Sequence, residues 1–213
     1  MNKYFSEYIG TFALVFAGTG AIIINDLSGG VITHLGVSVV FGLIVMTMIY
    51  ALGEISGAHL NPAVSFGFWL AKRLSSKELL SFGISQILGG LTASLILKSI
   101  FPQHTTLGMT LPHFVSVGGA FILEGILTFF LMFVIIHVAH GAKERGLMAG
   151  VAIGGMVALE AIFAGPITGA SMNPARSLAP ALISGHFDFL WVYITAPFIG
   201  SALAVLSCRM IRE

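Results

Sequence analysis

The sequence predicts an all-α membrane protein in which six transmembrane helices and two re-entrant half-helices form an inverted repeat. Composition is the first observation: 56% of the 213 residues are hydrophobic and 9% are charged, whereas a typical soluble domain has about 25% charged residues. The second observation is a set of six long apolar stretches. The third is the tripeptide Asn-Pro-Ala, which occurs twice and each time ends a similar phrase.

The six apolar stretches are the candidate membrane spans. Each is comparable to, or longer than, the ~20 apolar residues that cross a bilayer core. They cover residues 8–25, 27–53, 79–97, 125–142, 147–164 and 189–208. The fifth continues past Glu160, and the others contain no charged side chain. The first begins almost at Met1, so we expect it to be retained rather than cleaved as a signal peptide.

The placement of positive charge predicts the orientation. Six spans put both termini on one side of the membrane, together with the connections after the second and fourth spans. Eight of the ten Lys and Arg residues lie on that side: Lys3, Lys72, Arg73, Lys77, Lys143, Arg145, Arg209 and Arg212. That side is expected to be cytoplasmic. Short termini and the absence of an Asn-x-Ser/Thr site favour a bacterial inner membrane as the location.

The two halves of the chain resemble each other beyond the tripeptide. Glu7-x-x-x-Thr11-Phe12 in the first span matches Glu124-x-x-x-Thr128-Phe129 in the fourth. Three spans per half is an odd number, so the halves must cross the membrane in opposite directions, and special sites of such repeats lie near the midplane. We therefore expect one transmembrane domain, residues 1–213, with internal repeats at approximately 1–105 and 113–213.

Each Asn-Pro-Ala tripeptide is expected to begin a half-helix. Asn61 and Asn173 are preferred helix caps, and Pro62 and Pro174 suit the first helical position. About nine residues at 1.5 Å each cover only half of the hydrocarbon thickness. Non-helical backbone at that depth must be buried in protein or line a watery cavity. The preceding carbonyls would then form acceptor ladders along a pore: Gly57, Ala58, His59 and Leu60, and Gly169, Ala170, Ser171 and Met172.

Such a pore would select against charge. Two helix N-termini meeting at the midplane carry about half a positive charge each and repel cations. A water molecule that accepts hydrogen bonds from Asn61 and Asn173 would turn its hydrogens outward, which disfavours proton hopping along a water wire. Arg176 adds a fixed charge to the second half-helix, where Val64 holds the equivalent position in the first. The selective constriction is therefore expected on the extracellular side alone.

The paired Asn-Pro-Ala boxes, with Ser56-Gly57-Ala58-His59-Leu60 before Asn61-Pro62-Ala63 and Arg176-Ser177 after Asn173-Pro174-Ala175, resemble the aquaporin, or major intrinsic protein, family over the whole chain. The resemblance implies an aquaporin-like fold and a homotetramer with a separate pore in each protomer. It implies passive permeation and no cofactor. It also implies that Glu7 and Glu124 brace the re-entrant loops by accepting backbone hydrogen bonds.

The resemblance places the selectivity filter of the family on Phe41, Ala161, Ala170 and Arg176. Strict water channels usually have His at the position of Ala161, so we expect a wider and less polar aperture here. Ser177, Ala181 and Tyr193 are similar to the water channels, whereas Ile194 departs from them. We expect a channel for water and small uncharged solutes that excludes protons and ions. The alternative is a glycerol or small-solute facilitator in which water is a secondary permeant.

Other functions find little support. The spans contain no Ser, His and Asp arrangement and no metal-spaced cluster, so we expect neither an enzyme nor a metal site, and the net charge of +1 does not indicate nucleic acid binding. Arg176 argues against a cation channel. His59 is expected to line the pore, and His137 and His140 to lie at the membrane interface. Glu160 either lines the outer vestibule or, as we favour, hydrogen-bonds a neighbouring loop.

Overall fold

The computed structural model describes residues 2–139 and 147–212. Helices account for most of this part of the chain, and six of them are long and apolar enough to cross a membrane. The membrane-length helices are α1 (Asn2–Leu27), α2 (Thr33–Ser56), α4 (Ser76–Ile100), α5 (Val117–Val138), α7 (Ala149–Thr168) and α9 (Leu190–Arg212). The two short helices are α3 (Pro62–Leu70) and α8 (Pro174–Ser184). All-α class, six spans and two half-helices are thus confirmed.

Three helix starts differ by six residues or more from the charge-free stretches. Helix α1 begins at Asn2 rather than at residue 8. Helix α2 begins at Thr33 rather than at residue 27, because Gly29 and Gly30 adopt φ angles of 69° and 98° and turn the chain. Helix α5 begins at Val117 rather than at residue 125, and the Ser116 side chain caps it by accepting a hydrogen bond from the Gly119 amide. Glu124 therefore lies inside α5.

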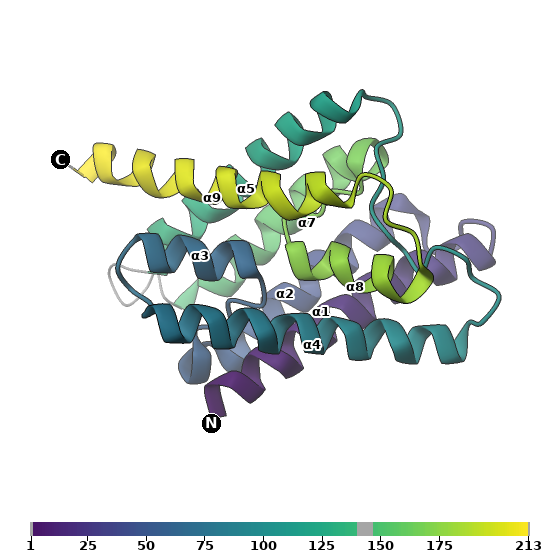
Figure 1. The fold of residues 1–213 in the computed structure, drawn as a ribbon, viewed down its shortest axis with the longest axis horizontal. Coiled ribbons are helices and arrows are strands. Elements are labelled where there is room, and N and C mark those ends of the chain that lie inside the picture. The colour runs from purple at the N-terminus through teal and green to yellow at the C-terminus, as the bar shows by residue number, and fades with distance from the viewer. Residues whose placement is uncertain (1, 140–146, 213) are drawn as a thin grey trace.

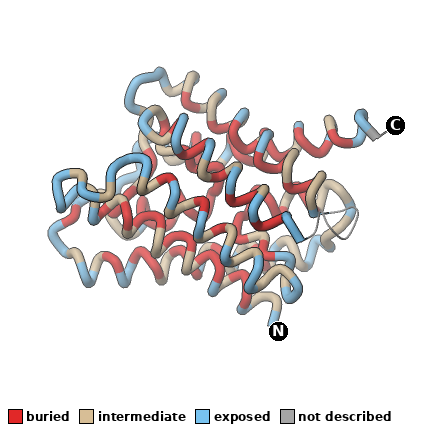
Figure 2. Tube along the Cα trace, turned by 180° about the vertical axis from the view of Figure 1, so that it is seen from behind, coloured by how far each residue is buried: buried red, intermediate tan, exposed pale blue. Residues whose placement is uncertain are grey.

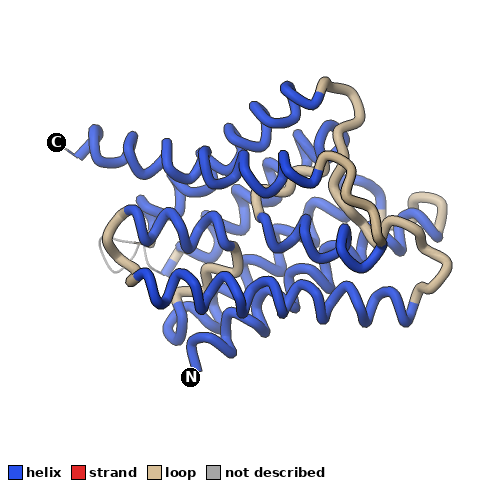
Figure 3. The backbone as a smooth tube through the Cα atoms, in the orientation of Figure 1, coloured by secondary structure: helices blue, strands red, loops and turns tan. Residues whose placement is uncertain are grey.

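The elements are arranged with both termini at one end of the bundle (Figure 1). The loop between α3 and α4 lies at the same end, and the loops before α2, after α4 and after α8 lie at the opposite end (Figure 3). The half-helices α3 and α8 run between the longer helices and do not cross the full bundle (Figure 1). Lys143, Arg145 and His140 lie outside the described residues.

Matching glycines of the two halves make the closest helix contacts. A Cβ atom on Gly89 of α4 would meet the Tyr8 carbonyl oxygen at 2.2 Å, and one on Gly200 of α9 would meet the Gly125 carbonyl oxygen at 2.1 Å. Only glycine lets these backbones approach so closely, as is common where helices pack within membranes. The α1–α4 contact of one half is repeated as the α5–α9 contact of the other, which is the inverted repeat in three dimensions.

Polar and apolar residues are distributed as in a membrane protein. Large apolar side chains are exposed on the outer faces, including Leu43, Ile122 and Leu203, whereas Glu7 and Glu124 are fully buried. The buried residues follow the inward sides of the helices (Figure 2). Ionisable groups inside a membrane protein face the bundle interior and are suspected of function. The interior is therefore where the site must be sought.

Candidate functional site

The two half-helices begin with the same asparagine cap. Asn61 has an extended backbone, and its Oδ1 accepts a hydrogen bond from the Ala63 amide at 2.9 Å. Asn173 is also extended, and its Oδ1 accepts from the amides of Ala175 at 3.0 Å and Arg176 at 3.3 Å. In both cases proline occupies the first helical position, where it has no hydrogen bond to lose.

The asparagine amides also join the two halves. Asn61 Nδ2 donates to the Met172 carbonyl at 2.8 Å, and Asn173 Nδ2 donates to the Leu60 carbonyl at 2.9 Å. Each amide group has two hydrogens, so one donor per asparagine remains for a passing molecule. The carbonyls of Leu60 and Met172, which the sequence assigned to the acceptor ladders, are thus shared with the asparagine of the opposite loop.

The loops before the asparagines have matching strained backbones. In the first loop Ala58 and Leu60 have φ angles of 47° and 53°, and in the second Ala170 and Met172 have 41° and 53°. Residues other than glycine avoid this left-handed region, at a cost on the order of 1 kcal/mol each. Such loops persist only when surrounding groups hold them in place.

Two buried glutamates hold these loops. The Glu7 carboxylate accepts hydrogen bonds from the His59 amide at 3.0 Å and the Leu60 amide at 2.7 Å, together with the Ser56 hydroxyl and the Gln86 amide. The Glu124 carboxylate accepts from the amides of Ser171 and Met172, each at 2.9 Å, and from the Thr168 hydroxyl at 2.7 Å. The glutamates therefore satisfy amides that would otherwise be buried without acceptors.

Two serines extend this support. His59 Nδ1 lies 3.1 Å from Ser65 Oγ, and in the second half Ser171 Oγ lies 2.5 Å from Ser177 Oγ. Gln86 Nε2 donates to both Glu7 and Ser65. The sequence analysis missed the supporting roles of Gln86 and Ser65. A serine four residues after each asparagine was the available signal, because it recurs in both phrases.

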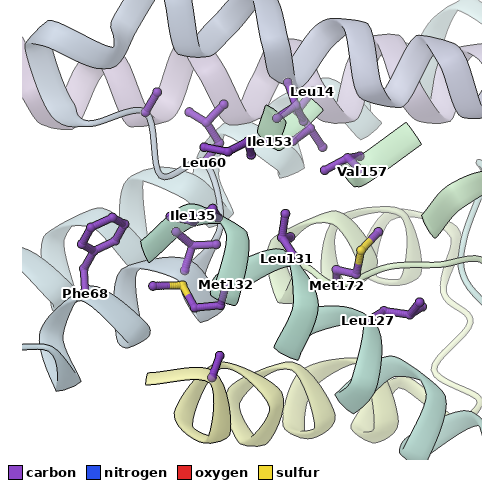
Figure 4. Close-up of a cluster of buried hydrophobic side chains, with 14 of the residues drawn as sticks. Leu14, Leu60, Phe68, Leu127, Leu131, Met132, Ile135, Ile153, Val157 and Met172 are labelled. Carbon is purple, nitrogen blue, oxygen red and sulfur yellow. The ribbon is translucent and has the colours of Figure 1, made fainter. Parts of the chain in front are cut away.

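A cavity of about 570 Å³ runs beside the two loops. Both cap asparagines line it, as do all four residues proposed for the filter. The walls formed by the surrounding helices are largely apolar. Figure 4 shows a cluster of buried apolar side chains, of which Leu14, Phe68, Leu131, Ile135, Ile153 and Val157 line the cavity from helices, while Leu60 and Met172 line it from the two loops. One polar wall facing apolar walls suits a small neutral molecule that bears hydrogen-bonding groups.

Arg176 supplies the fixed charge in this wall. Its side chain is 2% exposed, and its Nη1 donates to the Gly108 carbonyl at 2.8 Å. The guanidinium carbon lies 5.1 Å from the centre of the Phe41 ring, within cation–π range. Nε of Arg176 is buried and has no hydrogen-bond partner among the described residues. The contribution of Gly108, from the loop after α4, was not foreseen from the sequence.

Glu160 differs from the sequence expectation. It is 2% exposed, and neither carboxylate oxygen has a hydrogen-bond partner in the described part of the chain. The favoured interpretation, a hydrogen bond to a neighbouring loop, is therefore wrong. Glu160 is also absent from the described cavity wall, although its neighbour Ala161 is part of it. The side chain of residue 160 points away from the face of α7 that residue 161 presents, because successive residues on a helix diverge by about 100°.

His59 and His137 have ordinary surroundings. His59 lines the cavity and stacks on Phe68 with ring centroids 4.4 Å apart. His137 lies beside the Phe133 carbonyl at 2.8 Å and 3.7 Å from the sulfur of Cys208. No group of three or more His, Cys, Asp or Glu residues that could hold a metal occurs among residues 2–139 and 147–212.

Comparison with known proteins gives a consistent result. Residues 1–207 match the major intrinsic protein family. Aquaporin NIP1-4 of Oryza sativa subsp. japonica is 44% identical, over 100% of this chain and 77% of that protein. Nodulin-26 of Glycine max is 38% identical, over 100% of this chain and 78% of that protein.

Among solved structures, the aquaglyceroporin from Plasmodium falciparum superposes with a TM-score of 0.89 at 25% identity, over 99% of this chain and 98% of that one. The curated relatives named above are plant proteins, so the expectation of a bacterial member gains no support from them. The chain belongs to the major intrinsic protein family, the aquaporins, and is a multi-pass membrane channel for water and small neutral solutes rather than an enzyme.

Proposed function

We propose that the cavity beside the two re-entrant loops is the transport path, and that it passes water together with uncharged solutes the size of glycerol. The observation that carries this proposal is the composition of its wall. One cavity of about 570 Å³ touches both cap asparagines, the loop carbonyls and all four filter residues. Its lining also includes Glu54 at the opposite end of α2 from the filter.

The filter supports passage of solutes larger than water. Ala161 and Ala170 contribute only methyl groups, while Phe41 and Arg176 provide an aromatic face and a cation. A chain of hydroxyl groups could hydrogen-bond to Arg176 and the loop carbonyls while its carbon atoms contact Phe41. The name of the Plasmodium falciparum neighbour, an aquaglyceroporin, agrees with this wider selectivity.

Proton and ion exclusion rests on the meeting point of the half-helices. Asn61 and Asn173 each keep one amide hydrogen beyond their bond to the opposite loop. A water molecule between them is a double acceptor and cannot pass a proton along the file. The positive ends of α3 and α8, with Arg176 beside them, repel cations.

The assembly, orientation and repeat boundaries belong to the same proposal. The protein forms a homotetramer with one pore in each protomer, and both termini are cytoplasmic because most Lys and Arg residues belong to that side. The inverted repeats cover approximately residues 1–105 and 113–213. Paired contacts at Gly89 and Gly200 support the equivalence of the two repeats.

Reconstitution into liposomes tests the proposed function. A hyperosmotic step with an impermeant sugar should accelerate shrinkage over empty liposomes, and the same step with glycerol should be followed by rapid reswelling. A pH-sensitive dye inside the liposomes should report no proton entry. Water flux without glycerol reswelling would contradict the wide filter, and an ionic conductance would contradict the exclusion mechanism.

The alternative, a facilitator with water as a secondary permeant, is supported by the apolar walls of the cavity. Those walls give a single file of water few partners outside the loops. The same experiment separates the two functions, because the alternative predicts fast glycerol reswelling with water permeability close to that of empty liposomes.

A further inference from the structure

Helix α7 contains a proline close to the filter. Pro166 lies inside the helix, and proline has no amide hydrogen to donate to the carbonyl four residues earlier. That carbonyl belongs to Ile162, which directly follows Ala161 of the proposed filter. A backbone carbonyl without a donor is costly within a membrane. The sequence of α7 thus creates a requirement for a donor beside the filter.

His34, from the first turn of α2, meets this requirement. Its Nε2 lies 2.8 Å from the Ile162 carbonyl oxygen, and since a carbonyl only accepts, the imidazole must donate through Nε2–H. Gly165 provides the space for the ring, because a Cβ at that position would lie 2.7 Å from Cε1 of His34. Pro166 lacks the amide donor, Gly165 leaves space for the imidazole ring, and His34 donates a hydrogen bond to the Ile162 carbonyl in its place.

This contact joins the two helices that carry opposite residues of the filter. Phe41 lies on α2, seven residues after His34, and Ala161 lies on α7, next to Ile162. Below the filter the same two helices touch at Gly42 and Gly154, where a Cβ on either would meet the carbonyl oxygen of the other at 2.6 Å. The hydrogen bond from His34 thus joins the same two helices at a second point.

We propose that His34 is a positioning residue that sets the width of the filter by clamping α7 to α2. His34 touches no permeating molecule in this role and acts through the backbone of Ile162. The inference rests on the proposed function, in that it assigns selectivity to the gap between Phe41 and Ala161. Its chemical basis, a side-chain donor that replaces the amide missing at Pro166, is independent of which solute passes.

A double-mutant cycle with Pro166 tests the clamp. His34→Phe keeps the ring and removes the donor, whereas Pro166→Ala returns an amide hydrogen to the Ile162 carbonyl and makes the histidine redundant. In the parent background His34→Phe should raise the ratio of glycerol to water permeability about threefold, a change of the size expected for one interhelical hydrogen bond in a membrane protein. It should also lower the unfolding midpoint in detergent.

In the Pro166→Ala background the same substitution should change neither the permeability ratio nor the midpoint. His34→Gln, which keeps a donor, should restore most of the parent ratio. Thr47→Val is the matched control, because Thr47 is an exposed residue of α2 whose hydroxyl, in the described part of the chain, bonds to Leu43 and Ile44 of its own helix.

Equal effects of His34→Phe in both backgrounds, or no effect in the parent, would overturn the clamp. The unfolding midpoints distinguish a failure of the clamp from a failure of the proposed function. If the parent protein passes water but no glycerol, the wide filter is wrong, and the cycle of unfolding midpoints still decides whether His34 and Pro166 are coupled.

Discussion

At the scale of single residues, the side chain of each cap asparagine, Asn61 and Asn173, has three functions. Oδ1 caps a half-helix, one hydrogen of Nδ2 bonds the opposite loop, and the other remains available to the cavity. Arg176 also lines the cavity, and its Nη1 is held by the Gly108 carbonyl. We therefore expect selectivity to depend on hydrogen-bond donors that make no bond within the fold, such as the second Nδ2 hydrogen of each asparagine.

The midplane mechanism predicts the effect of Asn173→Asp. A carboxylate replaces a donor with a negative charge, so it weakens cation repulsion at the helix ends. It also removes the bond to the Leu60 carbonyl. We expect measurable proton entry into liposomes loaded with a pH-sensitive dye, and none for the parent protein. Identical proton fluxes in the two would rule out the electrostatic account.

The filter predicts the effect of Ala161→His. The larger side chain would fill the gap opposite Arg176 and add a donor. Glycerol permeability should fall by about tenfold, equivalent to roughly 1.4 kcal/mol of additional barrier, while water permeability falls far less because water needs a narrower path. Reswelling in glycerol measures the change. A parent protein that already excludes glycerol as completely as Ala161→His would contradict the wide aperture.

At the scale of helices and loops, equivalent residues of the two repeats meet two structural requirements. The loops need acceptors for buried amides, and Glu7 and Glu124 supply them from the N-terminal halves of α1 and α5. The long helices need close approach, and glycine provides it at Gly42 and Gly154. These two glycines lie nineteen residues before Asn61 and Asn173, respectively, so the contact between α2 and α7 is formed by equivalent residues of the two repeats.

This symmetric contact predicts a matched pair of destabilising changes. Gly42→Ala and Gly154→Ala each place a methyl group 2.6 Å from a carbonyl oxygen, so the helices must separate. We expect each to lower the unfolding midpoint in detergent by several degrees, at a cost of about 1–3 kcal/mol from overpacking.

Gly155→Ala is the control for this pair, because a Cβ there meets nothing within 4 Å and alanine favours helix. Its midpoint should stay at or slightly above that of the parent. A loss of stability as large as that of Gly154→Ala would show that the close approach is not the cause.

At the scale of the whole molecule, polar groups gather inside and apolar side chains cover the outside. Exposed apolar residues of α2, such as Leu35 and Leu43, face either lipid or a neighbouring protomer. The cavity lies within the single chain and is lined by both of its halves. A single chain therefore contains every part of the proposed path.

The proposed assembly predicts a specific mass and additive transport. In mild detergent, native mass spectrometry should give about four times the 22.5 kDa of the chain. Parent protein co-expressed with a variant that has a blocked cavity should show water permeability that falls linearly with the fraction of blocked chains. A steeper fall would mean that the protomers conduct only together.

The sequence by itself determined the class of the protein, the six spans, the two half-helices and the repeat that relates them. These features depend on local composition, on helix capping by Asn61 and Asn173, and on motif spacing, all of which can be read along the chain. The predicted starts of α2 and α5 were less accurate, because the charge-free stretches mark neither the turn at Gly29 and Gly30 nor the helix cap at Ser116.

Only the tertiary structure decided which distant groups complete the site. The Gly108 carbonyl that holds Arg176, the Gln86 amide on Glu7 and the His34 donor on Ile162 are separated from their partners by 68, 79 and 128 residues. No local pattern encodes such pairs, because they form when helices far apart in sequence pack together. The carboxylate of Glu160, which has no partner among the described residues, is of the same kind, because the sequence next to it could not reveal what surrounds it.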